Sequence, residues 1–348
     1  MNYPLKFKAA ILEELHAPLK VEEIEFRGPL LKGQILVKME FSGICGKQID
    51  EIDGNHGRDK FLPHLLGHEG SGEVIQIGPD VSKVKKGDKV ILHWMKGSGI
   101  QSETPSFFLN DKLINAGWVT TFNEYAVVSE NRVTLTPDPK EMELSALCGC
   151  VITTAMGVVS KQAKVSKEDD VLVYGCGGIG LCVIQTSFYY NPKTLIAVDI
   201  NDKSLEIAKS LGASHLINTD KEDIISTTKK ITNGKGASKV IVCTGNIKAI
   251  ENAYRSTSIP GKCFLIGVPP KGEFIKVEAN DIMHEKDLLG SLGGGIIPDI
   301  DIPEWFFIQK SGKVDFKKLI TSIDCLEDIN LAIEKVRKGE NGRCIIKF

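Results

Sequence analysis

The stretch VLVYGCGGIG, residues 171–180, decides the architecture of the central part of this 348-residue chain. It joins a short apolar run to the pattern G-x-G-x-x-G, and the helical sequence IGLCVIQTSFYY follows directly. Glycines in this pattern permit a tight turn and a close backbone approach to a pyrophosphate, which then lies at the positive end of the helix. They are Gly175, Gly177, Gly178 and Gly180.

The next apolar run, LIAVD, ends at Asp199, nineteen residues beyond Gly180. A carboxylate at this distance accepts hydrogen bonds from an adenosine ribose. It also repels a 2′-phosphate, and Ile200 follows it with no arginine alongside, so NAD is favoured over NADP. The alternative is an ordinary strand-to-helix turn with an incidental aspartate, which leaves the matched spacing unexplained.

Beyond this motif, apolar runs alternate with helical stretches as far as about residue 294. This alternation predicts a parallel sheet with helices on both faces, a doubly wound α/β domain over residues 152–294. Upstream, short β-branched runs broken by Gly, Pro and Asp predict a β-rich domain over residues 1–151. The mixed tail, 295–348, ends in the strand-like RCIIKF and is expected to pair back onto that first domain.

Composition limits the classes of partner. The chain has 43 Lys+Arg against 45 Asp+Glu and no long block of one sign, which argues against binding nucleic acid or a membrane surface. Its nine scattered cysteines indicate reduced thiols, and its first residues lack the apolar core of a signal peptide. We therefore expect a cytoplasmic protein that acts on a small molecule.

A candidate metal site is distributed over three segments of the chain. Cys45 lies in GICG, His68 and Glu69 lie in GHEG, and Cys150 lies at the end of the first domain. Two cysteines and a histidine suit zinc, and three protein ligands leave one coordination position for a substrate. Taken singly, each residue also fits a buried, purely structural role, and their spacing matches no compact zinc motif.

Several motifs together carry a family resemblance over essentially the whole chain: GICG, LLGHEGSGEVIQIG, KVKKGDKVI, GCVITTAMG, VYGCGGIGL, AVDIND, LGASHLIN and IGVPP. In order and distance they resemble the zinc-containing medium-chain alcohol dehydrogenases, a family that includes class III and polyol enzymes. GHE followed by GxGxV is the most specific of them. The resemblance implies a GroES-like β-rich catalytic domain, a Rossmann domain and a homodimer or homotetramer.

The resemblance also assigns roles to individual residues. It implies zinc ligation by Cys45, His68 and Cys150, with Glu69 beside the metal. It implies NAD contacts by the four fingerprint glycines, Asp199 and Ile200, by Arg343 near the pyrophosphate, and by Thr154, Ile266 and Val268 around the nicotinamide ring. Trp94 corresponds to an aromatic residue of the substrate pocket; core packing at a strand end is its alternative.

Two departures from the family pattern change what is expected. The family's second, structural zinc needs four closely spaced cysteines, and residues 93–117 contain none, so one zinc per chain is expected. The hydroxyl that usually passes the alcohol proton outward is replaced by Lys47, with Asp50 three residues later. Either these two residues, or a water held by them, replace the relay, or they form an exposed ion pair and the proton leaves through water.

The reaction expected is hydride transfer between the hydroxyl of an alcohol, polyol or sugar and NAD, with zinc as the Lewis acid. Two alternatives remain at this point. One is a zinc-free NAD(P)H-dependent quinone or enoyl reductase of the same superfamily, which the candidate ligands and Asp199 oppose. The other is a non-catalytic NAD-binding protein, which the altered relay at Lys47 supports.

Overall fold

The computed structural model describes residues 3–55, 57–339 and 342–348. Its chain contacts separate two compact units, which are described one at a time. Unit 1 comprises Met1–Thr153, Ile297–Phe307 and Ile320–Phe348, and unit 2 comprises Thr154–Ile296 and Ile308–Leu319.

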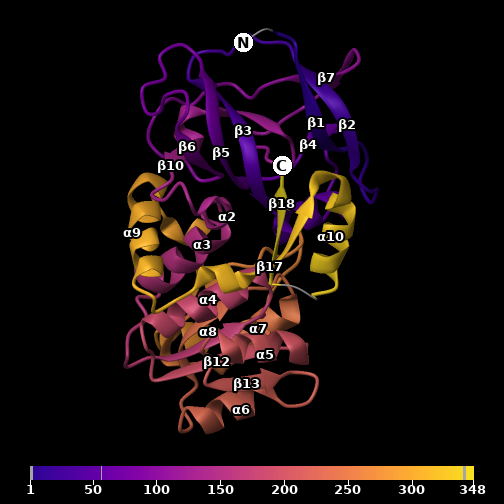
Figure 1. Ribbon diagram of the computed structural model, residues 1–348. Coiled ribbons are helices and arrows are strands. Elements are labelled where there is room, and N and C mark those ends of the chain that lie inside the picture. Colours follow the sequence, from indigo (N-terminus) through magenta and orange to yellow (C-terminus); the bar gives the residue numbers. More distant parts are fainter. Residues whose placement is uncertain (1–2, 56, 340–341) are drawn as a thin grey trace. The chain divides into compact units, whose positions relative to one another are not determined.

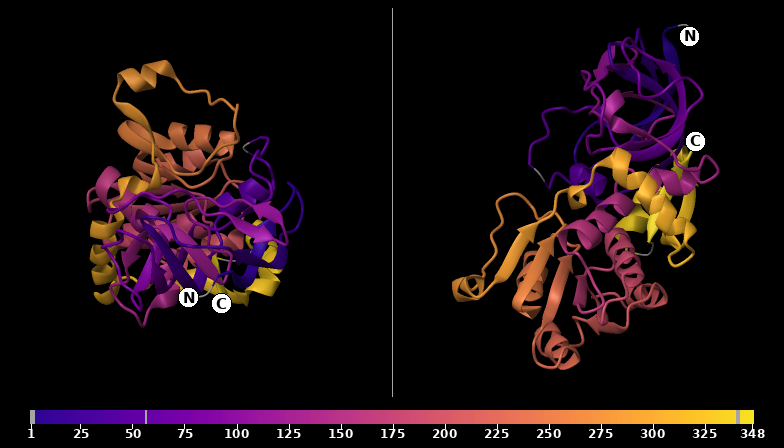
Figure 2. Two further views of the ribbon diagram at one scale, coloured as in Figure 1. Left: turned by 90° about the horizontal axis from the view of Figure 1, so that it is seen from above. Right: turned by 90° about the vertical axis from the view of Figure 1, so that its left-hand side faces the viewer.

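Unit 2 contains a six-stranded parallel sheet whose strand order is β13-β12-β11-β14-β15-β16. Its arrows run from magenta to orange in Figure 2, right. Numbered along the chain this is the order 3-2-1-4-5-6, the usual order of doubly wound dinucleotide-binding sheets. The strands are β11 (Asp170–Tyr174), β12 (Thr194–Asp199), β13 (His215–Asn218), β14 (Ala237–Val242), β15 (Thr257–Leu265) and β16 (Lys286–Gly290). The predicted doubly wound parallel sheet is confirmed.

Local sequence explains these elements. β11 is buried along its whole length, as expected for a strand covered on both faces. The side chain of Asn201 accepts a hydrogen bond from the Lys203 N–H and caps α5. The helices of this unit include α4 (Gly178–Tyr189), α5 (Asp202–Ser210), α6 (Ile224–Ile231), α7 (Ile247–Ser256) and α8 (Ala279–Met283). No helix among the described residues is long and apolar enough to cross a membrane.

Unit 1 is built mainly from two sheets, of orders β4-β1-β2-β7-β8 and β10-β6-β5-β3-β18-β17, with β9 also paired to β3. The first sheet contains β1 (Leu5–Leu12), β2 (Lys20–Phe26), β4 (His64–Leu65), β7 (Phe107–Leu109) and β8 (Lys112–Ile114). The second contains β3 (Gln34–Gly43), β5 (Glu69–Ile77), β6 (Lys89–His93), β9 (Tyr125–Ser129), β10 (Val133–Leu135), β17 (Ile320–Cys325) and β18 (Arg343–Lys347). The predicted β-rich first domain is thus present.

The end of the chain completes the second sheet. β18 pairs antiparallel with β3, opposite Phe41–Gly43, and parallel with β17 (Figure 1). The last strand of the tail thus pairs with the first domain as expected, whereas Ile308–Leu319 of the tail belong to unit 2. The remaining helices are α1 (Gly46–Ile52), α2 (Met142–Leu147), α3 (Val151–Gly157), α9 (Pro298–Lys310) and α10 (Ile329–Arg337).

Candidate functional site

The three candidate metal ligands meet within unit 1. Cys45 stands directly before α1, His68 directly before β5, and Cys150 directly before α3. One ligand atom from each lies within 4.8 Å of the other two. Zinc binds sulfur at about 2.3 Å and imidazole nitrogen at about 2.0–2.1 Å, so neighbouring ligands of one ion stand only a few ångströms apart. The fold thus gathers residues that are far apart in sequence.

Glycines beside the ligands make this convergence sterically possible. Gly67 adopts a φ of +90°, a conformation that side chains other than glycine rarely take. At Gly149, an added Cβ would stand 2.2 Å from the carbonyl oxygen of Leu92. A larger residue at either position would displace the adjacent ligand, His68 or Cys150.

The donor atoms fit a zinc ion. The Nε2 atom of His68 is buried and has no hydrogen-bond partner, whereas its Nδ1 contacts the side chain of Gln48. A hydrogen bond with Cys150 lowers the pKa of the Cys45 thiol well below its usual value; burial opposes this, while His68 and the charge of Arg343 add to it. A nitrogen without a partner and a thiol that readily loses its proton are what a zinc site requires.

Gln48 is a positioning residue that the motif analysis missed. Its side chain is buried, its Oε1 accepts the Cys45 N–H at 3.1 Å, and its amide nitrogen contacts His68 Nδ1. One amide therefore holds two of the three ligands. The sequence carries a signal for it, because the third residue of a helix can reach back to the N-cap, which here is Cys45.

Glu69 is fully buried and forms an ion pair with Arg343. Its other oxygen accepts the Val151 N–H at 3.2 Å. Glu69 is thus held next to two ligands, His68 and Cys150, but does not belong to the group of close ligand atoms. Arg343 was expected at a pyrophosphate; its guanidinium is buried against Glu69, burial lowers its pKa, and the contact with the cofactor stays a prediction.

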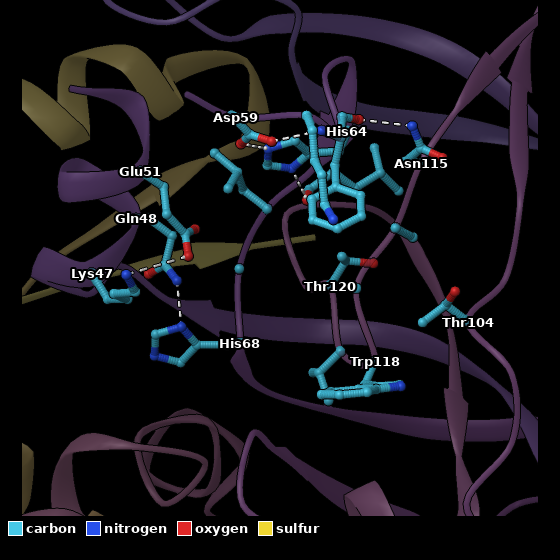
Figure 3. A pocket seen from close by; sticks show the side chains of 18 of the residues that line it. Lys47, Gln48, Glu51, Asp59, His64, His68, Thr104, Asn115, Trp118 and Thr120 are labelled. Atoms are coloured by element: carbon cyan, nitrogen blue, oxygen red, sulfur yellow. Dashed lines mark hydrogen bonds and ion pairs between the residues drawn. The ribbon is translucent and has the colours of Figure 1, made fainter. Parts of the chain in front are cut away.

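Lys47 and Asp50 both lie on α1, but their contacts are with other residues. The Lys47 ammonium stands 3.9 Å from a carboxylate oxygen of Glu51 (Figure 3), and Asp50 accepts a hydrogen bond of 2.9 Å from Asn55. One of the two alternatives was an exposed ion pair between Lys47 and Asp50. In the structure, Lys47 pairs with Glu51 instead. Both residues line a cavity that His68 also lines.

This cavity, of about 1110 Å³, lies within unit 1. Its aromatic wall contains Trp118, which sequence reasoning missed, whereas Trp94 is not among the described residues that line it. The Trp94 carbonyl instead accepts a hydrogen bond from Arg132. The role of Trp94 in a substrate pocket stays a prediction. No local pattern marks Trp118, apart from its place beside the segment 93–117, which departs from the family.

The fingerprint glycines form the predicted turn between β11 and α4 in unit 2. Gly175 has a φ of +94°, and a Cβ at Gly180 would lie 1.7 Å from the Gly175 carbonyl oxygen. At Gly177, the N-cap of α4, a Cβ would meet no atom within 4 Å. The turn therefore leaves open space at the helix N-terminus, which fits a pyrophosphate.

Asp199 ends β12 and faces this turn. Its carboxylate accepts the Cys176 N–H at 2.6 Å and the Asn201 N–H at 2.9 Å. Of the other residues expected at the cofactor, Thr154 is buried on α3, Ile200 is exposed after β12, and Ile266 and exposed Val268 follow β15. Their contacts with a cofactor stay predictions.

Among the described residues, Cys45, His68 and Cys150 form the one group of three or more possible metal ligands. The segment 93–117 forms instead the hairpin of β7 and β8, and its residues Glu103, Thr104 and Asn115 line the cavity.

Comparisons with known proteins agree with this geometry. A zinc-binding dehydrogenase family model matches residues 178–306, and a model of the alcohol dehydrogenase GroES-like domain matches residues 31–138. An S-(hydroxymethyl)glutathione dehydrogenase of Photobacterium damsela subsp. piscicida is 29% identical over 379 residues, covering 99% of this chain and 100% of that protein. The crystal structure of benzyl alcohol dehydrogenase from Acinetobacter calcoaceticus is 28% identical, with a TM-score of 0.90 and 99% of each chain covered. A zinc-binding alcohol dehydrogenase domain protein from Burkholderia ambifaria, 23% identical with a TM-score of 0.90 and 99% of each chain covered, shares the fold.

Proposed function

Because the chain belongs to the zinc-containing medium-chain alcohol dehydrogenase family, we propose that Cys45, His68 and Cys150 hold the catalytic zinc of an NAD-linked alcohol dehydrogenase. The observation that carries this proposal is the convergence of the three ligand atoms, with His68 Nε2 buried and unpartnered. The substrate proposed is an alcohol, polyol or sugar hydroxyl.

Zinc held by Cys45, His68 and Cys150 would supply a Lewis acid for the substrate oxygen, and NAD would supply the hydride acceptor. The chain's own residues position these groups and handle the proton. Gln48 orients Cys45 and His68, and Glu69 with Arg343 supports them from behind. Lys47 and Asp50, which face the cavity on α1, conduct the alcohol proton outward, directly or through water.

NAD is proposed to bind at the β11–α4 turn. Gly175, Gly177, Gly178 and Gly180 would hold its pyrophosphate, and Asp199 would accept hydrogen bonds from the ribose. Residues 1–151 and 295–348 then form the catalytic domain, and residues 152–294 form the NAD-binding domain. The two compact units separate between Thr153 and Thr154 and between Ile296 and Ile297, which supports these boundaries. Ile308–Leu319 differ from the division, since they belong to unit 2.

We also propose that the enzyme is a cytoplasmic homodimer or homotetramer. The nine cysteines, all within the described residues, form no disulfide, which supports a reducing compartment. β16 lies at the end of the parallel sheet, and the nearby side chains of Met283, Leu289 and Leu292 are exposed, so this edge suits a second copy of the chain.

The test is turnover. The zinc-loaded protein should reduce NAD with members of a panel of alcohols, polyols and sugars, followed by nicotinamide absorbance. Cys45→Ala and His68→Ala should each abolish turnover and zinc binding while the melting temperature of the zinc-free protein changes little, because the metal does not staple the fold. Cys148→Ala is the matched control, since Cys148 is buried two residues from Cys150 but outside the ligand group.

Failure of the wild type to turn over any alcohol would favour a non-catalytic NAD-binding protein. Turnover that persists after both ligand substitutions would favour a zinc-free reductase.

A further inference from the structure

The cavity next to His68 is lined on three sides by different parts of unit 1 (Figure 3). α1 contributes Lys47, Gln48, Asp50 and Glu51. Gly54 and residues 57–61 and 64–68 contribute the side that ends at His68, and residues 103–104 and 115–120 contribute the rest. A metal ligand thus stands at a wall of a space large enough for a substrate of ten or more non-hydrogen atoms.

Trp118 presents a large apolar surface inside this space. Its side chain is 54% exposed, although an indole gains free energy from burial. The guanidinium of Arg132 lies over the ring, 5.2 Å from its centroid, and Arg132 is held in turn by the Trp94 carbonyl. One face of the indole is therefore backed by a fixed, buried cation, which leaves the other face for a ligand.

The wall that carries Trp118 is rigidly joined to the ligand segment. The N–H groups of Thr121 and Phe122 both donate to the carbonyl oxygen of Leu66, two residues before His68. Asn115 and Leu65 are also joined by a backbone hydrogen bond of 2.9 Å. These bonds hold the backbone that carries Trp118 against the segment that leads to His68.

The rest of the lining combines apolar side chains, such as Phe61, Leu66 and Val119, with polar side chains and charges of both signs. Side chains able to bind hydroxyl groups line it, among them Lys47, Asp50, Glu103 and Thr104. Three cations and four carboxylates lie in its lining: Lys47, Arg58 and Lys60 against Asp50, Glu51, Asp59 and Glu103. A wholly apolar ligand would desolvate the polar groups of this mixed lining without replacing their hydrogen bonds, and charges of both signs do not favour an anion.

A ligand that matches both features has an apolar face and a rim of hydroxyl groups. We infer that the alcohol oxidised here belongs to a neutral pyranose sugar whose C–H face stacks on Trp118 while its hydroxyls bind the polar side of the cavity. This inference rests on the proposed dehydrogenase function and assigns its substrate class. Trp118 then determines specificity by selecting a ring over a linear chain.

The test compares matched substrates and variants in the zinc-loaded enzyme. Methyl β-glucopyranoside should be oxidised with a kcat/KM at least about tenfold above that of cyclohexanol, which has the ring without the rim of hydroxyls. Trp118→Ala should lower kcat/KM for the glycoside about tenfold relative to that for a linear alcohol, and Trp118→Phe should restore most of the loss, because a stacked aromatic face contributes an effect of that size. Phe307→Ala, which removes an exposed aromatic ring outside the cavity, should behave as the wild type.

Binding gives a readout that does not need turnover. Saturation-transfer NMR should detect methyl β-glucopyranoside on the wild type and lose the signal with Trp118→Ala, whose melting temperature shows that it is folded. Oxidation confined to linear or aryl alcohols, or an equal effect of Trp118→Ala on all substrates, would overturn the inference and leave the dehydrogenase function intact. A glycoside signal that depends on Trp118 in a protein without dehydrogenase activity would support the sugar site and refute the proposed function.

Discussion

At the scale of the residue, Gln48 joins two ligands through a single neutral amide. Outer partners of a ligating histidine fix its ring orientation, and losing one costs about tenfold to a hundredfold in metal affinity. We predict that Gln48→Ala weakens zinc binding by that factor, measured by competition with a chromophoric chelator. Gln48→Glu should bind zinc more tightly than Gln48→Ala, because one carboxylate oxygen can accept from Cys45 N–H and the other from the Nδ1–H that a histidine ligating through Nε2 carries. Equal zinc affinities of the wild type and Gln48→Ala would show that Gln48 only caps α1 and does not support the metal site.

A second prediction at this scale concerns Asp199 and the choice between NAD and NADP. A 2′-phosphate placed against its carboxylate should cost roughly 1.4 kcal/mol or more, so that NAD is preferred over NADP by at least about tenfold. Asp199→Asn should bring kcat/KM for NADP closer to that for NAD, mainly by raising the value for NADP. The amide oxygen of the introduced side chain can still accept one backbone N–H. Asp202→Asn is the control, since this exposed carboxylate, three residues on, pairs with Lys221. Equal kcat/KM values of the wild type for NAD and NADP would contradict the proposed role of Asp199 in excluding a 2′-phosphate.

At the scale of the element, a polar network joins the ends of β6 and β10 to α9. His93, at the end of β6, is fully buried; its Nδ1 donates to the Met95 carbonyl at 2.7 Å, and its Nε2 lies 3.0 Å from the Thr134 hydroxyl. That hydroxyl stands 2.6 Å from Asp299, which also pairs with Lys83 at 2.5 Å. Burial lowers the pKa of His93 to about 4, so the folded protein keeps this imidazole neutral at pH 7.

This network predicts how stability changes with pH. The unfolded chain protonates His93 below about pH 6.5 and the folded chain only near pH 4, so stability falls as the pH is lowered between these values. The contribution of this one group is at most about 3 kcal/mol. We expect thermal unfolding of the metal-stripped protein to show a weaker acid dependence in His93→Gln, and His284→Gln, an exposed histidine, to keep the wild-type slope. The same dependence of the melting temperature on pH in the wild type, His93→Gln and His284→Gln would contradict the prediction.

Elements also show what the sequence could and could not reveal. The β11–α4 turn and Asp199 were predictable because the steric rules for glycine and the strand-to-strand distance are local. The doubly wound sheet followed from the alternation of apolar strands and helical stretches. The meeting of Cys45, His68 and Cys150 depends on three separate segments. Their residue types suggested a zinc site, but their spacing matches no compact motif, so the family resemblance was needed to assign all three to one ion. Trp118 has no local signature at all, because its importance comes from a cavity made by distant segments.

At the scale of the whole molecule, the described residues provide one set of metal ligands. The segment 93–117 lacks the four cysteines of a structural zinc and forms a hairpin and part of the cavity wall instead. We therefore predict one zinc per chain by elemental analysis of the purified, desalted protein. Two tightly held zinc ions per chain would show that another site exists and would contradict the interpretation of this segment.

The pairing of β18 with β3 sets the order in which the newly made chain can fold. β3 leaves the ribosome early, but the strand that pairs beside Phe41–Gly43, Arg343–Lys347, is made long afterwards. The second sheet of unit 1 is thus completed only after Lys347 has been synthesised, whereas the six parallel strands of unit 2 are all made by residue 290. During synthesis, the nascent chain carries an unpaired strand edge close to the thiol of Cys45, a candidate zinc ligand. Chaperones would protect this state from aggregation.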